Sequence, residues 1–398
     1  MLRITILTAL AALSVASLSA RPRARDAGIP FDGTPGPLNA ITDVQGVEVG
    51  HVTLIAGDGP LEVGRGPVRT GVTAILPRGK AADAAPVFAG TYSLNGNGEM
   101  TGTAWIEESG FLEGPILLTN THSVGVVRDA IIAWQVRRSG SGRRDVPWSL
   151  PVVAETWDGW LSDINGFHVK PEHVFTALDD ARNGPVPEGS VGGGTGMVSY
   201  EFKGGIGTAS RRLAADLGGF TLGVLVQANH GVRRQLVVAG VPVGREIGGG
   251  TRRFAGSNPT DLAGLSVGET GSILIIVATD APLLPHQLKR LARRAALGLA
   301  RTGAVSGNGS GDLFLAFSTA PVGTSAAIGT PVDVKALTNE GMSPLFESTV
   351  EAVEEAIINA LVAGETMTGR DGHTAEGVPI PRLQEILKQY NRLVAPAR

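Results

Sequence analysis

The sequence contains no cysteine, so neither disulfide bonds nor thiol chemistry contributes to its stability or its activity. It also lacks an excess of charge of one sign, because 34 lysines and arginines stand against 37 aspartates and glutamates in 398 residues. A formal net charge of −3 gives no reason to expect a nucleic acid or an acidic membrane surface as a partner. After the first 20 residues, no apolar run is long enough to span a membrane.

Motifs for metals, phosphates and a common class of hydrolases are missing as well. The seven histidines show no His-Glu-x-x-His pattern or other metal-ligand spacing, so we expect no metal and no cofactor. The glycine-rich residues 192–196 lack the spacing and the Lys-Ser/Thr pair of a phosphate-binding loop, and tight turns explain them better. Ser310 does not lie in a Gly-x-Ser-x-Gly motif, because Asn308 and Asp312 occupy the glycine positions.

The first 20 residues have the features of a secretory signal. Arg3 supplies a positive charge, residues 4–15 are mostly apolar but too short to span a bilayer, and small residues follow. Cleavage after Ser19 or Ala20 is expected, which would leave an exported mature chain of residues 21–398 in the periplasm or outside the cell. An uncleaved anchor is the weaker alternative, since a helix would stop at residues 21–25, Arg-Pro-Arg-Ala-Arg.

Segments typical of strands and of helices alternate along the rest of the chain without a linker-like break. Apolar and alternating runs predict strands at residues 44–55, 71–77, 85–89, 115–119, 152–154, 220–228, 273–278 and 313–318. Helices are predicted at residues 124–136, 170–182, 285–301 and 344–363. Residues 90–99 are too polar and glycine-rich for regular structure, so we expect a loop there. The pattern indicates a single α/β domain of layered sheets and helices.

The stretch around Ser272 organises the rest of the chain. Six consecutive apolar residues, 273–278, follow Gly271-Ser272 and end before Asp280, which predicts a strand covered on both faces. A serine at the start of such a strand could be a nucleophile, or it could satisfy a backbone group as in an ordinary turn. The stretch by itself favours the second interpretation, because Gly-Ser pairs are common in turns.

Other polar side chains also stand at strand ends, namely Ser310 with Asp312, Asn229 and Glu155. Side chains at such positions can converge on one cleft. Acyl transfer needs a nucleophile, a base that takes its proton and donors that face the oxyanion. Since this set has no histidine, the natural base for Ser272 would be an α-amine, whose pKa near ~8 leaves a usable neutral fraction. That amine belongs to Ser272 only if the chain is cut immediately before it.

Several long and unusual motifs are spread over residues 37–387. They are Asn-Gly-Asn-Gly-Glu at 95–99, Thr-Asn-Thr-His-Ser-Val-Gly at 119–125, Glu-Thr-Trp-Asp-Gly at 155–159, Gly-Gly-Gly-Thr-Gly-Met at 192–197, Tyr-Glu-Phe-Lys-Gly-Gly at 200–205, Gln-Ala-Asn-His-Gly at 227–231, Thr-Gly-Ser-Ile at 270–273, Ala-Thr-Asp-Ala-Pro-Leu at 278–283 and Gly-Asn-Gly-Ser-Gly-Asp-Leu-Phe-Leu-Ala-Phe-Ser-Thr at 307–319. With these motifs the chain resembles the L-aminopeptidase/D-esterases and β-peptidyl aminopeptidases, the DmpA-like family of self-processing serine peptidases.

The resemblance implies that the precursor cuts itself between Gly271 and Ser272, which gives a large chain, 21–271, and a small chain, 272–398. Ser272 would then be both the N-terminal residue of the small chain and the nucleophile. Ser310 and Asp312 would form a hydroxyl–carboxylate relay that orients Ser272 and its amine. Gly271 suits this role, because it has no Cβ and its carbonyl is open to attack.

The resemblance also implies how a substrate is held. Asn229 would supply a side-chain donor to the oxyanion, and Glu155 would meet the free ammonium of the substrate, with Trp157 beside it. The expected substrates are short peptides, amides or esters with a free amine, in the L-aminoacyl, D-aminoacyl ester or β-aminoacyl series. The implied fold is a four-layer αββα sandwich, similar in architecture to N-terminal-nucleophile hydrolases but differently connected. Members of this family typically form tetramers of processed heterodimers.

Two other functions remain open from the sequence. An acyltransferase of the ornithine acetyltransferase type uses the same layered fold but cuts itself before a threonine, so the serine at 272 and the export signal count against it. A non-catalytic secreted binding protein is the second alternative, and an uncut chain on a denaturing gel would support it.

Overall fold

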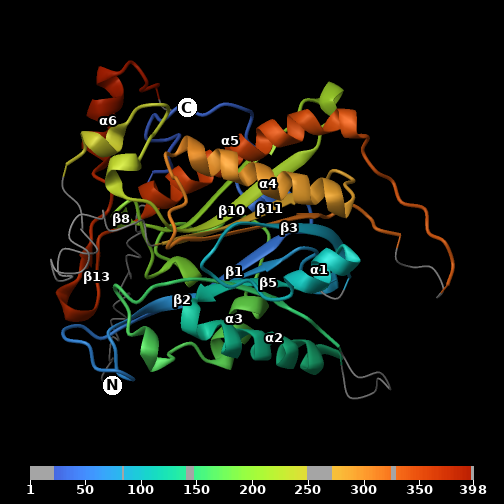
Figure 1. Cartoon of the computed structure of the whole chain (residues 1–398), viewed down its shortest axis with the longest axis horizontal. Coiled ribbons are helices and arrows are strands. Elements are labelled where there is room, and N and C mark those ends of the chain that lie inside the picture. The colour runs from blue at the N-terminus through green and yellow to red at the C-terminus, as the bar shows by residue number, and fades with distance from the viewer. Residues whose placement is uncertain (1–21, 83–84, 140–147, 249–270, 324–328, 396–398) are drawn as a thin grey trace, which may run out of the picture.

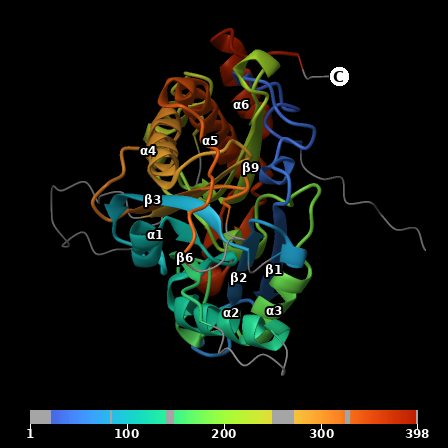
Figure 2. The ribbon, with the colours of Figure 1, turned by 90° about the vertical axis from the view of Figure 1, so that its right-hand side faces the viewer.

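The computed structural model describes residues 22–82, 85–139, 148–248, 271–323 and 329–395 (Figure 1). The predicted signal segment, residues 1–20, lies outside these ranges. Two β-sheets face each other in the middle of the molecule, and helices cover both outer faces (Figures 1 and 2). This arrangement confirms the predicted αββα sandwich. None of the helices in the described ranges is long and apolar enough to cross a bilayer.

The two sheets differ in size. The first sheet has the strand order β1 (Glu48–Ala56), β2 (Val68–Leu76), β5 (Ile116–Asn120) and β6 (Val152–Thr156). The second sheet has the order β4 (Phe111–Leu112), β3 (Val87–Gly96), β12 (Gly311–Ser318), β11 (Ser272–Thr279), β10 (Thr221–Asn229) and β9 (Gly205–Arg212). Two short ribbons join β7 (Val198–Ser199) to β8 (Phe202–Lys203) and β13 (Met367–Thr368) to β14 (Thr374–Ala375). The pairs β5–β6 and β11–β12 are parallel, and the other pairs within the two sheets are antiparallel.

Each sheet carries helices on its outer face (Figure 1). The first sheet is covered by α2 (Val124–Ser139) and α3 (Pro171–Asp179), and the second by α4 (Pro285–Arg301) and α5 (Ser343–Ala363). Two shorter helices are α1 (Thr103–Ser109), beside β3, and α6 (Ile380–Gln389), near the C-terminus. Short 3₁₀ helices occupy connections at Ile41–Asp43, Lys80–Ala82, Thr121–Ser123, Ile164–Gly166, Gly192–Gly194, Ala215–Leu217, Arg233–Gln235, Val243–Arg245, Asn339–Met342 and Arg370–Gly372.

The side chains of strand β11 show why the six-stranded sheet lies in the middle of the molecule. Its Ile273, Ile275 and Val277 belong to the core cluster that includes residues of α4 and α5. The alternate residues Leu274, Ile276 and Ala278 belong to the cluster between the two sheets. All six side chains are fully buried, and each large one contributes about 1.5–3 kcal/mol to folding. The predicted strand with two apolar faces is therefore confirmed.

Strand β3 corrects one expectation from the sequence. Residues 90–99 were expected to form a loop, but β3 continues to Gly96 and pairs with β12, Gly96 opposite Gly311. The hydrogen bonds to β12 come from a segment more than 200 residues away and outweigh the weak strand propensity of a polar, glycine-rich run. Strand β6 is also longer than expected, so Glu155 and Thr156 lie within it and not after it.

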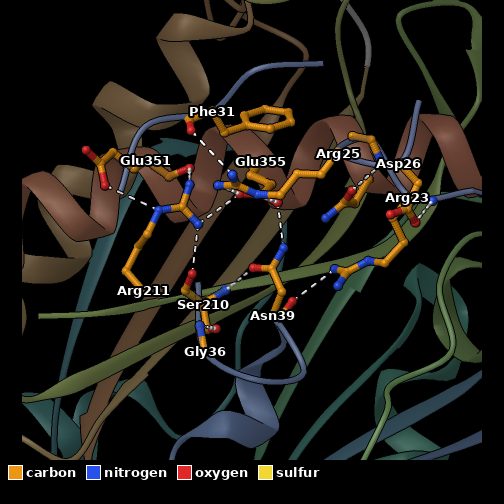
Figure 3. Close-up of polar contacts among 12 residues, drawn as sticks. Arg23, Arg25, Asp26, Phe31, Gly36, Asn39, Ser210, Arg211, Glu351 and Glu355 are labelled. Carbon is orange, nitrogen blue, oxygen red and sulfur yellow. Dashed lines mark hydrogen bonds and ion pairs between the residues drawn. The ribbon is translucent and has the colours of Figure 1, made fainter. Parts of the chain in front are cut away.

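The N-terminal segment is fixed to helix α5 by a network of buried charges (Figure 3). Glu355 of α5 accepts from Arg25 Nε at 2.8 Å and from Asn39 Nδ2 at 2.6 Å, and it pairs with Arg211 of β9 at 2.8 Å. Burial alone would raise the pKa of Glu355, but the hydrogen bonds and the charges of Arg25 and Arg211 outweigh it and lower that pKa. The network thus joins the beginning of the chain to its last long helix.

Candidate active site

Three neighbouring strands place Ser272 between Asn229, a predicted site residue, and Gly311, which separates the predicted residues Ser310 and Asp312. Ser272 begins β11, opposite Asn229 of β10 on one side and Gly311 of β12 on the other. The backbone N–H of Gly311 donates to Ser272 Oγ at 3.2 Å and to the carbonyl oxygen of Gly271 at 3.1 Å. The Ser272 side chain is held in this way at the rim of the sheet, with the whole residue 6% exposed.

Gly271 can only be glycine in this position. A Cβ there would lie 2.3 Å from the carbonyl oxygen of Asn229 and 2.9 Å from Cα of His230. Both are backbone atoms of the adjacent strand end, so neither can move aside without disturbing the sheet. The close approach of β10 to the peptide bond before Ser272 therefore requires a residue without a side chain.

Ser310 and Asp312 lie next to this position on β12. Ser310 immediately precedes Gly311, and its hydroxyl donates to Asp312 Oδ1 at 2.7 Å. Both residues are buried. Burial raises the pKa of Asp312, although the hydrogen bond from Ser310 opposes the rise. The two predicted relay residues thus form a hydroxyl–carboxylate pair beside the strand partner of Ser272.

The side chain of Asn229 is fixed at both ends of its amide. Its Oδ1 accepts from the backbone N–H of Val198 at 2.9 Å, and its Nδ2 donates to the carbonyl oxygen of Trp157 at 2.9 Å. An amide nitrogen carries two hydrogens in a fixed plane, so the bond to Trp157 sets the direction of the second one. Asn229 therefore joins the end of β10 to the segment that follows β6.

Glu155 is a buried carboxylate on β6, 4% exposed. The hydroxyl of Thr121 donates to Oε2, and the backbone N–H of Glu99 donates to Oε1 at 3.0 Å. Burial raises its pKa, although these two hydrogen bonds and the charge of His122 oppose the rise. No lysine or arginine within the described ranges forms an ion pair with Glu155. An isolated buried carboxylate is costly, so this position favours an incoming cation.

Trp157 lies two residues beyond Glu155 and is 40% exposed. Its indole lies against Gly159, where a Cβ would approach the ring to 2.6 Å. The place of Trp157 beside the substrate stays a prediction, and the exposed part of the ring offers the apolar surface that this role needs.

A cavity of about 580 Å³ adjoins this region between α1 and α4. Its lining includes Gly98, Met100 and Leu313. Gly98 separates it from the carboxylate, since a Cβ on Gly98 would lie 3.4 Å from Glu155 Oε1. No group of three or more metal-binding side chains occurs in the part of the chain that the structure describes.

The sequence did not assign a role to Thr121, Asn120 or Asp158, which all lie around Glu155. Asn120 ends β5 in register with Thr156 of β6, and its Nδ2 donates to Asp158 Oδ2 at 3.0 Å. Their position in the sequence could have indicated them, because polar residues at the ends of parallel strands meet at the same edge of a sheet.

Comparison with known proteins places these features in a family. Residues 39–375 match the model of peptidase family S58. The beta-peptidyl aminopeptidase BapA of Sphingosinicella microcystinivorans is 53% identical over 390 residues, which cover 96% of each protein. The solved beta-aminopeptidase of Burkholderia sp. has 51% identity and a TM-score of 0.81, and the match covers 92% of this chain and 98% of that one.

A second solved structure gives the fold. The L-aminopeptidase D-Ala-esterase/amidase of Ochrobactrum anthropi, described as a prototype for the serine aminopeptidases and a variant of the Ntn hydrolase fold, has 47% identity and a TM-score of 0.83. This match covers 94% of the chain and the whole of that protein. The comparisons support the predicted hydrolase and not the acyltransferase or the binding protein. The chain belongs to peptidase family S58 and is a serine aminopeptidase.

Proposed function

We propose that the protein is made as a precursor that cuts itself between Gly271 and Ser272 and then uses Ser272 as the nucleophile of an aminopeptidase. The observation that carries this proposal is the position of Ser272. It starts a rigid central strand, its neighbour on β12 donates to the carbonyl before it, and the Ser310–Asp312 pair lies alongside.

In self-cleavage, Ser272 Oγ attacks the carbonyl carbon of Gly271, and the acyl group moves from the Ser272 nitrogen to its oxygen. The nitrogen gains the proton that the hydroxyl loses, and it becomes the free α-amine of Ser272. Water then hydrolyses the Gly271 ester. The N–H of Gly311, 3.1 Å from the Gly271 carbonyl oxygen, is placed to stabilise the negative charge that develops there.

In turnover, the α-amine of Ser272 takes the proton from Oγ as Oγ attacks the substrate carbonyl. The protonated amine then donates to the leaving amine, and water hydrolyses the acyl-enzyme. The pair of Ser310 and Asp312 holds Oγ and the amine in the geometry for this proton transfer, because an unoriented amine is a poor base. Asn229 contributes an amide donor on the opposite side, at the end of β10.

Glu155 gives the enzyme its requirement for a free N-terminus. The carboxylate is buried, fixed by Thr121 and by the backbone of Glu99, and without an ion-pair partner among the described residues. A substrate ammonium would supply the missing positive charge. The substrates proposed are short peptides, amides and esters with a free amine. Two of the relatives named above are β-aminopeptidases, so we place β-aminoacyl compounds first among them.

We infer that the processed chains assemble as a homotetramer of heterodimers and that the protein is exported. The tetramer rests on the family resemblance of the motifs, and export rests on residues 1–20 of the sequence. Light scattering of the purified protein and the cellular fraction that contains it would test these two points.

The self-cleavage test compares the purified wild type with Ser272→Ala on a denaturing gel. The wild type should give two chains, the smaller one starting at Ser272, and the variant should give one uncut, inactive chain. N-terminal sequencing identifies the cut. A small chain that starts at Ser310, or an uncut wild type that is fully active, would rule the proposal out.

The substrate test uses paired p-nitroanilides, one with a free β-amino group and one N-acetylated. Only the compound with the free amine should be hydrolysed. Glu155→Gln should raise the KM for this compound by a larger factor than it lowers the rate of self-cleavage, because self-cleavage has no ammonium to bind. Equal turnover of both compounds would exclude an aminopeptidase site at Glu155.

A further inference from the structure

We propose that Asp158 is a positioning residue of the ammonium site, a second carboxylate that holds the ends of β5 and β6 and strengthens the binding of a cation at Glu155. The proposal rests on the proposed function of Glu155. It concerns a residue three positions further along the chain, buried between the glycine-rich loop at 192–196 and the end of β5.

Asp158 connects the three segments that shape the site. Its Oδ2 accepts from Asn120 Nδ2 at 3.0 Å. Asn120 precedes Thr121, whose hydroxyl donates to Glu155. On the other side, Asp158 follows Trp157, whose carbonyl oxygen accepts from Asn229 Nδ2. A shift of the Asp158 side chain would therefore displace both Thr121 and Trp157.

The close packing around Asp158 keeps it in place. The residue is 0% exposed. A Cβ on Gly196 would lie 2.8 Å from Asp158 Cβ, so the glycine loop is pressed against it. Its backbone carbonyl accepts from the N–H groups of Leu161 and Ser162 at 3.1 Å, which fixes the turn after β6. The side chain cannot leave this position without opening the turn.

The second oxygen of the carboxyl group has a different environment. Asp158 Oδ1 is buried and has no hydrogen-bond partner among the described residues, and the same is true of Asn120 Oδ1. A buried acceptor without a donor raises the cost of the ionised form. Burial accordingly raises the pKa of Asp158 to about 7, and the Glu155 carboxylate adds to the rise, which the Thr70 hydroxyl and the hydrogen bond from Asn120 oppose.

The Glu155 carboxylate is the charged group that raises the pKa of Asp158, and it has no ion-pair partner among the described residues. On the neighbouring segments, Arg69 pairs with Asp58 and Arg370 pairs with Asp371. His122, whose ring stacks on Phe167, lowers the pKa of Glu155 through its charge but forms no ion pair with it among the described residues. Within the described ranges, two carboxyl groups without an ion-pair partner therefore share this buried region. An ammonium at Glu155 favours ionisation of Asp158, and by linkage an ionised Asp158 favours the ammonium.

The test compares wild type with Asp158→Asn, whose amide oxygen can still accept from Asn120 but carries no charge. The kinetics of a β-aminoacyl p-nitroanilide are measured from about pH 5.5 to about pH 9. In the wild type, KM should fall as the pH rises through about 7. In Asp158→Asn this fall should vanish, with KM about tenfold higher above neutrality. The pH dependence of kcat that comes from the Ser272 α-amine should be the same in both proteins.

Two further variants make the result specific. Thr70→Val removes a hydroxyl that lowers the pKa of Asp158 and accepts from Asn120 Nδ2 at 2.9 Å. In this variant the fall of KM should therefore occur at a higher pH. Asp163→Asn is the matched control, a buried aspartate in the same turn that pairs with His168 at 2.8 Å, and its KM profile should match the wild type. Thr70→Val also decides the question if Asp158→Asn fails to fold.

The outcomes separate this proposal from the proposed function. If the wild type hydrolyses the free amine but Asp158→Asn keeps both KM and its pH dependence, Asp158 has no such role and the aminopeptidase assignment stands. The role of Asp158 would also be overturned if KM changed in Asp163→Asn as much as in Asp158→Asn. It would likewise be overturned if KM fell at the same pH in Thr70→Val as in the wild type. If the wild type does not hydrolyse the free amine, both proposals fail.

Discussion

Single residues at the candidate site are determined by contacts with the backbone of neighbouring strands. Gly271 is the clearest case, because a methyl group would meet the carbonyl oxygen of Asn229 at 2.3 Å. Asp158 is another, because its carboxyl group is fully buried and one of its oxygens has no hydrogen-bond partner among the described residues. Each leads to a measurable expectation.

Gly271→Ala should destabilise the protein by about 1–3 kcal/mol, as overpacking does, and should slow self-cleavage because the scissile carbonyl is displaced. Gly125→Ala is the matched control. Gly125 lies in α2 with no atom within 4 Å of an added Cβ, so this change should stabilise by about 0.5–1 kcal/mol. Denaturant unfolding and the rate of appearance of the small chain measure both effects. A Gly271→Ala precursor that matures at the wild-type rate would contradict the proposed geometry.

Asp158 should make stability depend on pH in a defined direction. The pKa is raised from 3.8 to about 7, so between these values the folded state holds a proton that the unfolded state has lost. The free energy of unfolding therefore falls by up to about 4 kcal/mol as the pH rises through this window. Above about pH 7 this contribution no longer changes with pH. Unfolding of wild type and Asp158→Asn from about pH 4 to about pH 8 measures the difference between them. A constant difference across the window would show that Asp158 does not hold a proton in the folded state.

At the scale of the elements, helix α5 contributes Glu351 and Glu355 to a network of buried charges (Figure 3). Arg211, whose side chain is 1% exposed, pairs with Glu355 at 2.8 Å and with Glu351 at 3.3 Å. The network joins β9, the N-terminal segment and α5. The cost of breaking it lies mainly in the buried arginine that would be left behind.

Glu355→Ala should therefore destabilise the protein by about 3–5 kcal/mol. Glu385→Ala removes an exposed partner of Arg382 three residues away on α6 and should cost less than about 1 kcal/mol. Thermal and denaturant unfolding of the two variants gives the comparison. Similar small losses in both would mean that the α5 network does not depend on its central carboxylate.

At the scale of the whole molecule, the predicted cut does not separate the protein into two bodies. Strands β11 and β12 would belong to the small chain, yet they lie between β10 and β3 of the large chain in one sheet. Helices α4 and α5 of the small chain share a core cluster with β10 of the large chain. The two chains would therefore share one hydrophobic core after cleavage.

The processed chains should consequently elute together in gel filtration at any protein concentration tested and unfold in one transition. They should separate only in denaturant strong enough to unfold the whole domain. Gel filtration and a denaturing gel of the same fractions measure this. Spontaneous release of the small chain from native enzyme would contradict the shared core.

The sequence by itself determined the elements whose patterns are strong and local. The helix predicted at 285–301 begins and ends at the same residues as α4, because a proline at its start and one apolar face specify it without help from the rest of the chain. The strand after Ser272 is equally evident, since six apolar residues fit a position covered on both sides. The motifs also named Ser272, Ser310, Asp312, Asn229 and Glu155, and their catalytic roles stay predictions.

Only the tertiary structure decided which of these residues stand side by side. Asn229 and Ser272 are 43 positions apart in the sequence, and they are opposite each other because the register of β10 on β11 places them so. The extension of β3 to Gly96 depends on hydrogen bonds to β12, which local propensity does not contain. The burial of Asp158 beside Glu155 depends on the parallel pairing of β5 and β6 and on a glycine loop folded over it. Charge balance in a buried region is a property of the folded arrangement, so the sequence could supply the carboxylates but not their environment.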